Sequence, residues 1–117
     1  MLIIYGNDEV WGRFGEADFA ALVRDTDAHN TALFASGELI GAYGVADAVM
    51  AKQVRREDRG TVVTDGPYIE TKAYIGSLSI VDVVAEARAI EIAAAMPSAR
   101  FVPIEIRPLM HEAARDA

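Results

Sequence analysis

The chain has no cysteine and only two histidines, and these shortages narrow its chemistry. Without cysteine, disulfides, thiolate metal sites and thiol catalysis are all excluded. The histidines and carboxylates show no ligand spacing such as His-x-x-x-His, so we expect no metal and no other cofactor. The lack of cysteine also fits a reducing compartment, and we expect a cytoplasmic protein.

Long hydrophobic runs are missing as well. The chain has no stretch of about 18 apolar residues, the length that a membrane-spanning helix needs. Its N-terminus also lacks the basic and apolar segments of a signal peptide. The formal net charge of −7 would repel phosphate backbones. We therefore expect neither a membrane nor a nucleic acid as a partner.

What remains suits one globular domain over residues 1–117, because 52% of the residues are hydrophobic and 25% are charged. Apolar runs and alternation predict strands at Met1–Tyr5, Glu38–Gly44, Val49–Arg56, Thr61–Thr64, Tyr74–Val81 and Phe101–Leu109. Residues 9–15 have no clear period and are predicted as a loop or short turn. Two helices are predicted: Glu16–Ser36, closed by Gly37, and Val83–Met96, with Asp82 as N-cap and Val83, Ala87, Ile90 and Ala94 buried.

This order predicts an α+β, ferredoxin-like fold, with helices on one face of a mainly antiparallel sheet. The other face would carry apolar side chains that water should not reach, namely Ile3, Leu39, Tyr43 and Val81. We therefore predict a homodimer that closes sheet on sheet.

The segment Val62–Lys72 contains the most constrained backbone of the chain. Gly66 tolerates positive φ, Pro67 fixes φ near −65°, and Asp65 can accept a hydrogen bond from the backbone two residues on. Such a rigid corner would hold its polar side chains in reproducible positions, as binding and catalysis require. Asp65 is therefore a candidate catalytic residue, or else it simply braces the turn; the candidate ligand-binding residues here are Tyr68, Glu70 and Lys72.

Residues 63–72, Val-Thr-Asp-Gly-Pro-Tyr-Ile-Glu-Thr-Lys, resemble the YCII-related proteins of the DGPF type, with Tyr68 in the place of the phenylalanine. Gly76, Arg100-Phe101 and residues 105–108 extend the resemblance over nearly the whole chain. The resemblance implies a ferredoxin-like subunit that pairs into a dimeric α/β barrel with a small-molecule pocket and no settled activity. It also implies an association with extracytoplasmic-function sigma factors.

His29 continues the apolar stripe of the first helix, which runs through Phe19, Leu22, Thr26 and Leu33. It is a candidate for proton transfer near neutral pH, or else a packed histidine at the rim of the core. In the wider YCII group the proposed catalytic helix histidine falls one turn earlier, at Thr26. That role cannot be carried over to threonine.

The last strand alternates clearly, with Glu105 and Arg107 on the face opposite its apolar side chains. In a paired barrel these two could hold a polar substrate, or they could pair with each other. Tyr43 of the second strand is a further candidate for substrate binding.

Two classes of function fit these residues. One is a metal-free acid–base enzyme for a small anionic or lactone-type substrate, in which Asp65 or His29 moves a proton and Lys72 or Arg107 holds the substrate. The other is a non-catalytic, ligand-sensing or regulatory domain with the same pocket. A pocket filled by Tyr43, Tyr68 and Tyr74 would instead indicate a protein-interaction role.

Overall fold

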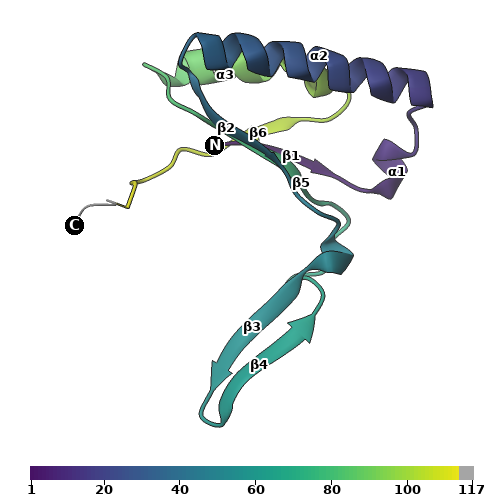
Figure 1. Cartoon of the computed structure of the whole chain (residues 1–117), viewed down its shortest axis with the longest axis vertical. Coiled ribbons are helices and arrows are strands. Elements are labelled where there is room, and N and C mark those ends of the chain that lie inside the picture. Colours follow the sequence, from purple (N-terminus) through teal and green to yellow (C-terminus); the bar gives the residue numbers. More distant parts are fainter. Residues whose placement is uncertain (114–117) are drawn as a thin grey trace.

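The computed structural model describes residues 1–113, and the last four residues of the predicted domain, 114–117, lie outside them. It confirms an α+β fold built on a four-stranded antiparallel sheet (Figure 1). The sheet has the order β2-β5-β1-β6 and consists of β1 (Leu2–Gly6), β2 (Leu39–Gly44), β5 (Tyr74–Val81) and β6 (Ile104–Ile106).

The connections in this sheet explain the positions of the helices. Strands β1 and β2 both pair antiparallel with β5, so they are parallel to each other and need the crossover through α1 (Asp8–Trp11) and α2 (Glu16–Ala35). Strands β5 and β6 both pair antiparallel with β1, and they are joined through α3 (Glu86–Ala95) and η2 (Pro97–Arg100). This topology is compatible with the predicted ferredoxin-like arrangement.

The end of α2 was predicted correctly, but the start of α3 was not. Helix α2 ends where expected, because Gly37 adopts a φ of 81°. The N-cap position of α3 is Ala85 and not Asp82, and no side chain caps this end of the helix. The backbone N–H of Asp82 instead donates to the Glu38 carbonyl at 2.8 Å, so the chain stays tied to β2 before the helix begins.

Both helices pack on one face of the sheet, where Leu2, Ile4 and Leu39 meet Leu33 of α2 and Ile92 of α3. Of the predicted buried seam, Val83 packs against this core just before α3, but Ala87, Ile90 and Ala94 are exposed. The buried residues of the helix are instead Ala89, Ile92 and Ala93. A helix so rich in alanine has no distinct large apolar stripe, and the hydrophobic pattern therefore leaves its orientation open.

The helix-free face exposes less apolar surface than the sequence predicts. Ile3 is 2% exposed within a single chain, and Leu39 faces the helices because the pairing of β2 with β5 shifts register between Leu39 and Gly41. Tyr43 remains 55% exposed, and its ring lies over Gly41, where a Cβ would collide with it. Val81 is partly buried and packs against the helix-side core. Of the four predicted positions, only Tyr43 therefore keeps the exposure that was expected.

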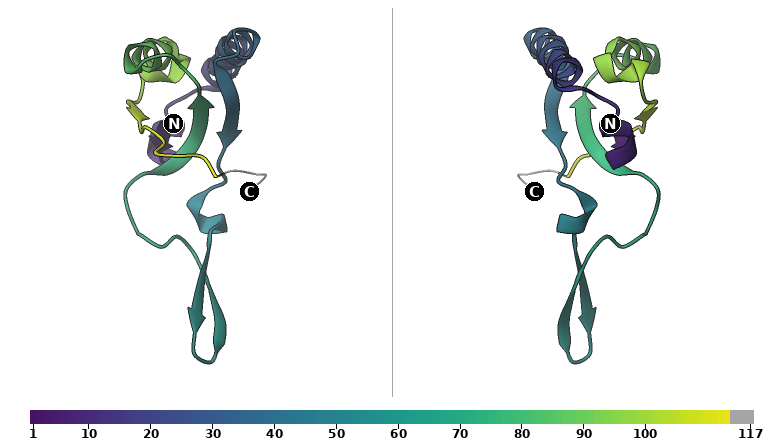
Figure 2. Two further views of the ribbon diagram at one scale, coloured as in Figure 1. Left: turned by 90° about the vertical axis from the view of Figure 1, so that its left-hand side faces the viewer. Right: turned by 90° about the vertical axis from the view of Figure 1, so that its right-hand side faces the viewer.

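Between β2 and β5 the chain makes a long excursion through η1 (Ala48–Met50) and the hairpin β3 (Lys52–Glu57) and β4 (Gly60–Asp65). We call residues 52–65 the arm. Its two strands pair only with each other and project away from the sheet (Figures 1 and 2). As a result the radius of gyration is 17.0 Å, whereas about 13 Å is typical of a compact domain of this length.

Candidate functional site

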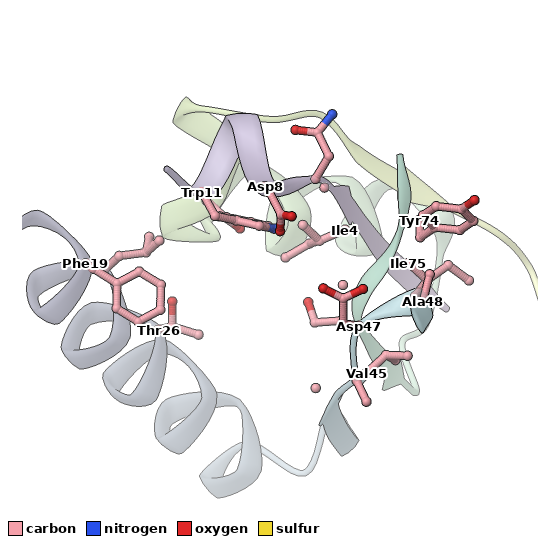
Figure 3. Close-up of a pocket in the computed structure, with 18 of the residues that line it drawn as sticks. Ile4, Asp8, Trp11, Phe19, Thr26, Val45, Asp47, Ala48, Tyr74 and Ile75 are labelled. Atoms are coloured by element: carbon pink, nitrogen blue, oxygen red, sulfur yellow. The ribbon is translucent and has the colours of Figure 1, made fainter. Parts of the chain in front are cut away.

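A cavity of about 760 Å³ lies between α2 and the end of the sheet from which the arm departs (Figure 3). Pockets for small organic ligands usually measure roughly 300–1,000 Å³ and are mostly apolar. Phe19 and Thr26 line this cavity from α2, and Val45 and Ile75 face them from the sheet side. Its size and walls are therefore those of a ligand site.

Trp11 forms another wall, and two local features position it. The Asn7 side chain caps α1 by accepting the Val10 N–H at 2.8 Å, which fixes the turn that carries Trp11. The indole then lies on Gly6, where a Cβ would come within 2.5 Å of the indole Nε1. Only glycine at position 6 allows this contact without a shift of the ring.

The charged residues that line the cavity are Asp8, Asp27, Asp47 and Lys72. Asp47 is held in place as the N-cap of η1, where its carboxylate accepts the Val49 N–H at 3.1 Å. Lys72 is anchored by its carbonyl, which accepts a hydrogen bond from Asn7 at 3.0 Å. With three carboxylates and one ammonium, the cavity favours a neutral or cationic molecule over an anion.

Of the residues predicted from the rigid corner, Lys72 lines the cavity, whereas Asp65, Tyr68 and Glu70 do not. The Asp65 carboxylate forms an ion pair with Lys52 across the base of the arm and is 81% exposed. The turn is braced by other groups, since the Gly66 N–H donates to the Ala51 carbonyl at 2.8 Å. The Gln53 side chain also donates to the carbonyls of Gly66 and Pro67, at 3.2 and 3.0 Å.

His29 lies outside the cavity, although Thr26 of the same stripe lines it. Its Nε2 is buried and has no hydrogen-bond partner among the described residues. Burial, aided by the positive charge of Arg88, lowers the pKa of His29. The structure thus places this histidine away from any substrate in the cavity of its own chain.

Glu105, Arg107 and Tyr43 are also outside the cavity. Glu105 is paired with Ile3, which puts it on the helix-free face, and Arg107 forms an ion pair with it at 3.9 Å. A hydrogen bond to Glu105 raises the pKa of Tyr5. The predicted site residues therefore fall into separate places on the single chain: the arm and the loop after it, α2, and the helix-free face.

Sequence reasoning missed most of the cavity, including Asp8, Trp11, Phe19 and Asp47. For α2 a signal existed, because Phe19, Val23 and Thr26 are spaced three or four apart and lie on one helix face. For Asp8 and Asp47 no such signal existed, because Asp8 begins the short helix α1 and Asp47 caps η1, and the two come together only through the fold.

Fold and cavity together define a small α+β domain with a ligand-sized cavity under its long helix. The family model of the YCII-related domain matches residues 2–112, and the chain belongs to this family. No curated protein matches the chain. No helix of the described residues is long and apolar enough to cross a membrane.

Proposed function

We propose that this protein binds a small, neutral, largely apolar organic molecule in the cavity beneath α2. The observation that carries the proposal is the cavity itself, whose surface is mostly apolar and has the aromatic side chains of Trp11 and Phe19 in its walls. Aromatic walls supply most of the binding energy for such ligands, and the few polar groups set their orientation.

A lactone-type molecule fits this lining better than a small anion. Its ring would pack against the aromatic walls, and its carbonyl oxygen could accept a hydrogen bond from the Lys72 ammonium. An anion would meet the carboxylates of Asp8, Asp27 and Asp47 at the same time.

If the bound molecule reacts, the cavity offers metal-free acid–base chemistry. The Asp47 carboxylate would take a proton from the substrate, and Lys72 would stabilise the negative charge that develops on the carbonyl oxygen. Asp65 or His29 could replace Asp47 as the proton acceptor only if a second copy or a rearrangement brought it to the cavity.

A dimeric α/β barrel, formed by the helix-free faces of two copies in the cytoplasm, completes this proposal. It is supported by the exposed ring of Tyr43 on that face and by the extended shape of the single chain. In the barrel, Glu105 and Arg107 would face the partner.

Trp11 is the only tryptophan of the chain and lines the cavity, so its fluorescence should report ligand entry directly. We expect some members of a panel of small lactones and carboxylates to change this fluorescence and to raise the melting temperature, with lactones ahead of carboxylates. Thr26→Phe should block both effects by filling the cavity. The matched variant Thr31→Phe, on an exposed side of the same helix, should leave both intact. Equal binding to both variants would refute the proposed site.

A non-catalytic sensor domain that works with an extracytoplasmic-function sigma factor is the second candidate. It is favoured by the positions of Asp65 and His29, which both lie outside the cavity. Incubation of the protein with a ligand found in the panel separates the two functions. Consumption of the ligand that Asp47→Asn abolishes would establish the enzyme, and binding without consumption would establish the sensor.

A further inference from the structure

A second cavity adjoins α2, and the proposed function makes no use of it. Its volume is about 750 Å³, again within the roughly 300–1,000 Å³ of ligand pockets. Three segments form its walls, namely the connection from α1 to α2, the N-terminal half of α2, and η2 with the residue after it. We call this hollow between residues 10–14, 18–25 and 97–101 the second cleft. It shares Leu22 with the cavity beneath α2, so the helix is a wall of both.

Two aromatic rings form the apolar side of the second cleft. Phe14 and Phe101 pack edge to face, with ring centroids 4.9 Å apart and an interplanar angle of 79°. Phe101 nevertheless remains 55% exposed, so the fold covers only part of its ring. Aromatic rings favour a further ring in an edge-to-face or offset arrangement. The cleft therefore offers an aromatic surface to a ligand that carries a ring of its own.

The charged residues of the second cleft are divided between its walls. Asp18 and Asp25 come from α2, about two turns apart along the helix. Arg13 comes from the connection that precedes α2, and Arg100 comes from η2. The carboxylates thus belong to one wall, and the guanidinium groups belong to the other two.

These opposite charges do not neutralise one another across the cleft. Arg13 pairs with Glu9 at 3.3 Å, and Asp25 pairs with the adjacent Arg24 at 3.7 Å. Within residues 1–113, no ion pair joins an arginine of the cleft to one of its aspartates. A simple anion in the cleft would meet two carboxylates, and a simple cation would meet two guanidinium groups. A ligand with both charges would find a partner for each.

We propose that the second cleft binds a free aromatic amino acid in its zwitterionic form. The carboxylate of the amino acid accepts hydrogen bonds from the Arg100 guanidinium, whose planar fork suits bidentate binding. The ammonium group donates to the carboxylates of α2, and the ring packs against Phe101. This site is distinct from the cavity beneath α2, and it does not depend on the function proposed for that cavity.

Calorimetry with three related ligands tests the charge requirement. Phenylalanine should bind the wild-type chain saturably and raise its melting temperature. Phenylpropionate lacks the ammonium group and phenethylamine lacks the carboxylate, so each should bind at least about tenfold more weakly. No binding of phenylalanine at millimolar concentration would overturn the proposal. Equal affinity for phenylalanine and phenylpropionate would overturn it as well.

Three substitutions to phenylalanine on α2 test the location of the site. Ala21→Phe should abolish binding of the amino acid, because the new ring fills the second cleft. Ala20→Phe, at an exposed neighbouring position that lines neither cavity, should leave it intact. Thr26→Phe, which blocks the cavity beneath α2, should leave it intact too, so the two proposed sites succeed or fail separately. Loss of binding in Thr26→Phe, or its survival in Ala21→Phe, would place the amino acid elsewhere and refute the second site.

Arg100→Gln provides a milder change that keeps the shape of the cleft. It should weaken phenylalanine about tenfold and leave phenethylamine unchanged, because only the first ligand has a carboxylate. Arg56→Gln, exposed on the arm, is the matched control and should affect neither ligand. Wild-type affinity of Arg100→Gln for phenylalanine, or equal losses for both ligands, would contradict the proposed contact. Circular dichroism of each variant checks that its fold is unchanged.

Discussion

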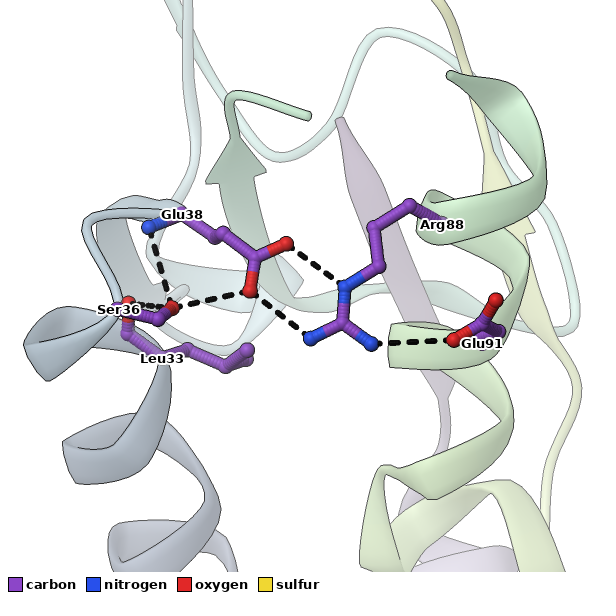
Figure 4. A network of polar contacts seen from close by, with 5 residues as sticks. All are labelled: Leu33, Ser36, Glu38, Arg88 and Glu91. Atoms are coloured by element: carbon purple, nitrogen blue, oxygen red, sulfur yellow. Dashed lines mark hydrogen bonds and ion pairs between the residues drawn. The ribbon is translucent and has the colours of Figure 1, made fainter. Parts of the chain in front are cut away.

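Arg88 holds Glu38 by two hydrogen bonds, from Nε to Oε2 at 2.7 Å and from Nη2 to Oε1 at 2.8 Å (Figure 4). The pair joins α3 to the residue that precedes β2. Ser36 donates to the same carboxylate at 3.0 Å, and Glu91 accepts from Arg88 at 3.2 Å. A bidentate, charge-assisted contact thus ties α3 to the turn that follows α2.

Because of this contact, the stability of the protein should fall in the acidic pH range. Hydrogen bonds from Arg88 and Ser36 lower the pKa of Glu38 from 4.5 to about 2. The folded state stabilises the ionised form of Glu38 more than the unfolded state does. The contribution of Glu38 to the free energy of unfolding is therefore complete above the unfolded pKa, and it is lost as the pH falls from 4.5 through about 2. Glu38→Gln should flatten the fall in the free energy of unfolding over this window. Urea titrations at several pH values would measure it, with Glu86→Gln, exposed on α3, as the control. Equal slopes for Glu38→Gln and wild type would contradict the prediction.

His29 should also make the stability of the protein fall as the pH falls, but for a different reason. Burial, with a contribution from Arg88, lowers its pKa below the ordinary 6.5, so the unfolded chain takes up a proton first and stability falls as the pH drops below 6.5. His29→Leu removes the unpaired Nε2, and we expect it to stabilise the protein by about 1 kcal/mol and to remove this slope. His111→Leu, at an exposed position, is the control. Loss of a ligand-dependent activity in His29→Leu, with stability unchanged, would identify a catalytic histidine instead.

The sequence is sufficient to predict the sheet and the long helix, because both have strong local signals. Alternation and apolar runs mark β1, β2 and β5, and Gly37 marks the end of α2 where its φ of 81° requires glycine. The start of α3 could not be predicted, since a backbone bond from Asp82 to a strand that is distant in sequence delays it. Apart from Lys72, the charged lining of the cavity could not be predicted either, because Asp8 in α1 and Asp47 before η1 are distant in the sequence and only the tertiary fold brings them together.

Asp65→Asn should leave the fold and the cavity of the single chain unchanged. Its carboxylate is mostly exposed and pairs with Lys52, and exposed ion pairs contribute at most about 1 kcal/mol. Thermal unfolding and ligand-induced changes in Trp11 fluorescence should therefore match those of the wild type. A variant that folds normally but fails to turn over a ligand would show that Asp65 reaches a substrate in the assembled protein. Collapse of the fold would show that it braces the corner after all.

Gly6→Ala should move the wall of the cavity. The new Cβ would lie 2.5 Å from Nε1 and Cζ2 of Trp11, so the indole has to shift, and overpacking of this kind costs about 1–3 kcal/mol. We expect a change in the emission of Trp11, a lower free energy of unfolding and weaker ligand binding.

Gly44→Ala is the matched control for this change. Gly44 also ends a strand and lines the same cavity, but a Cβ there meets nothing within 4 Å and its φ is not positive. The control should keep the emission of Trp11 and should be neutral or slightly stabilising, because alanine restricts the unfolded chain. Urea titration with fluorescence detection measures both quantities in one experiment. If the two variants lost stability equally, the packing of Trp11 on Gly6 would not be what shapes this wall.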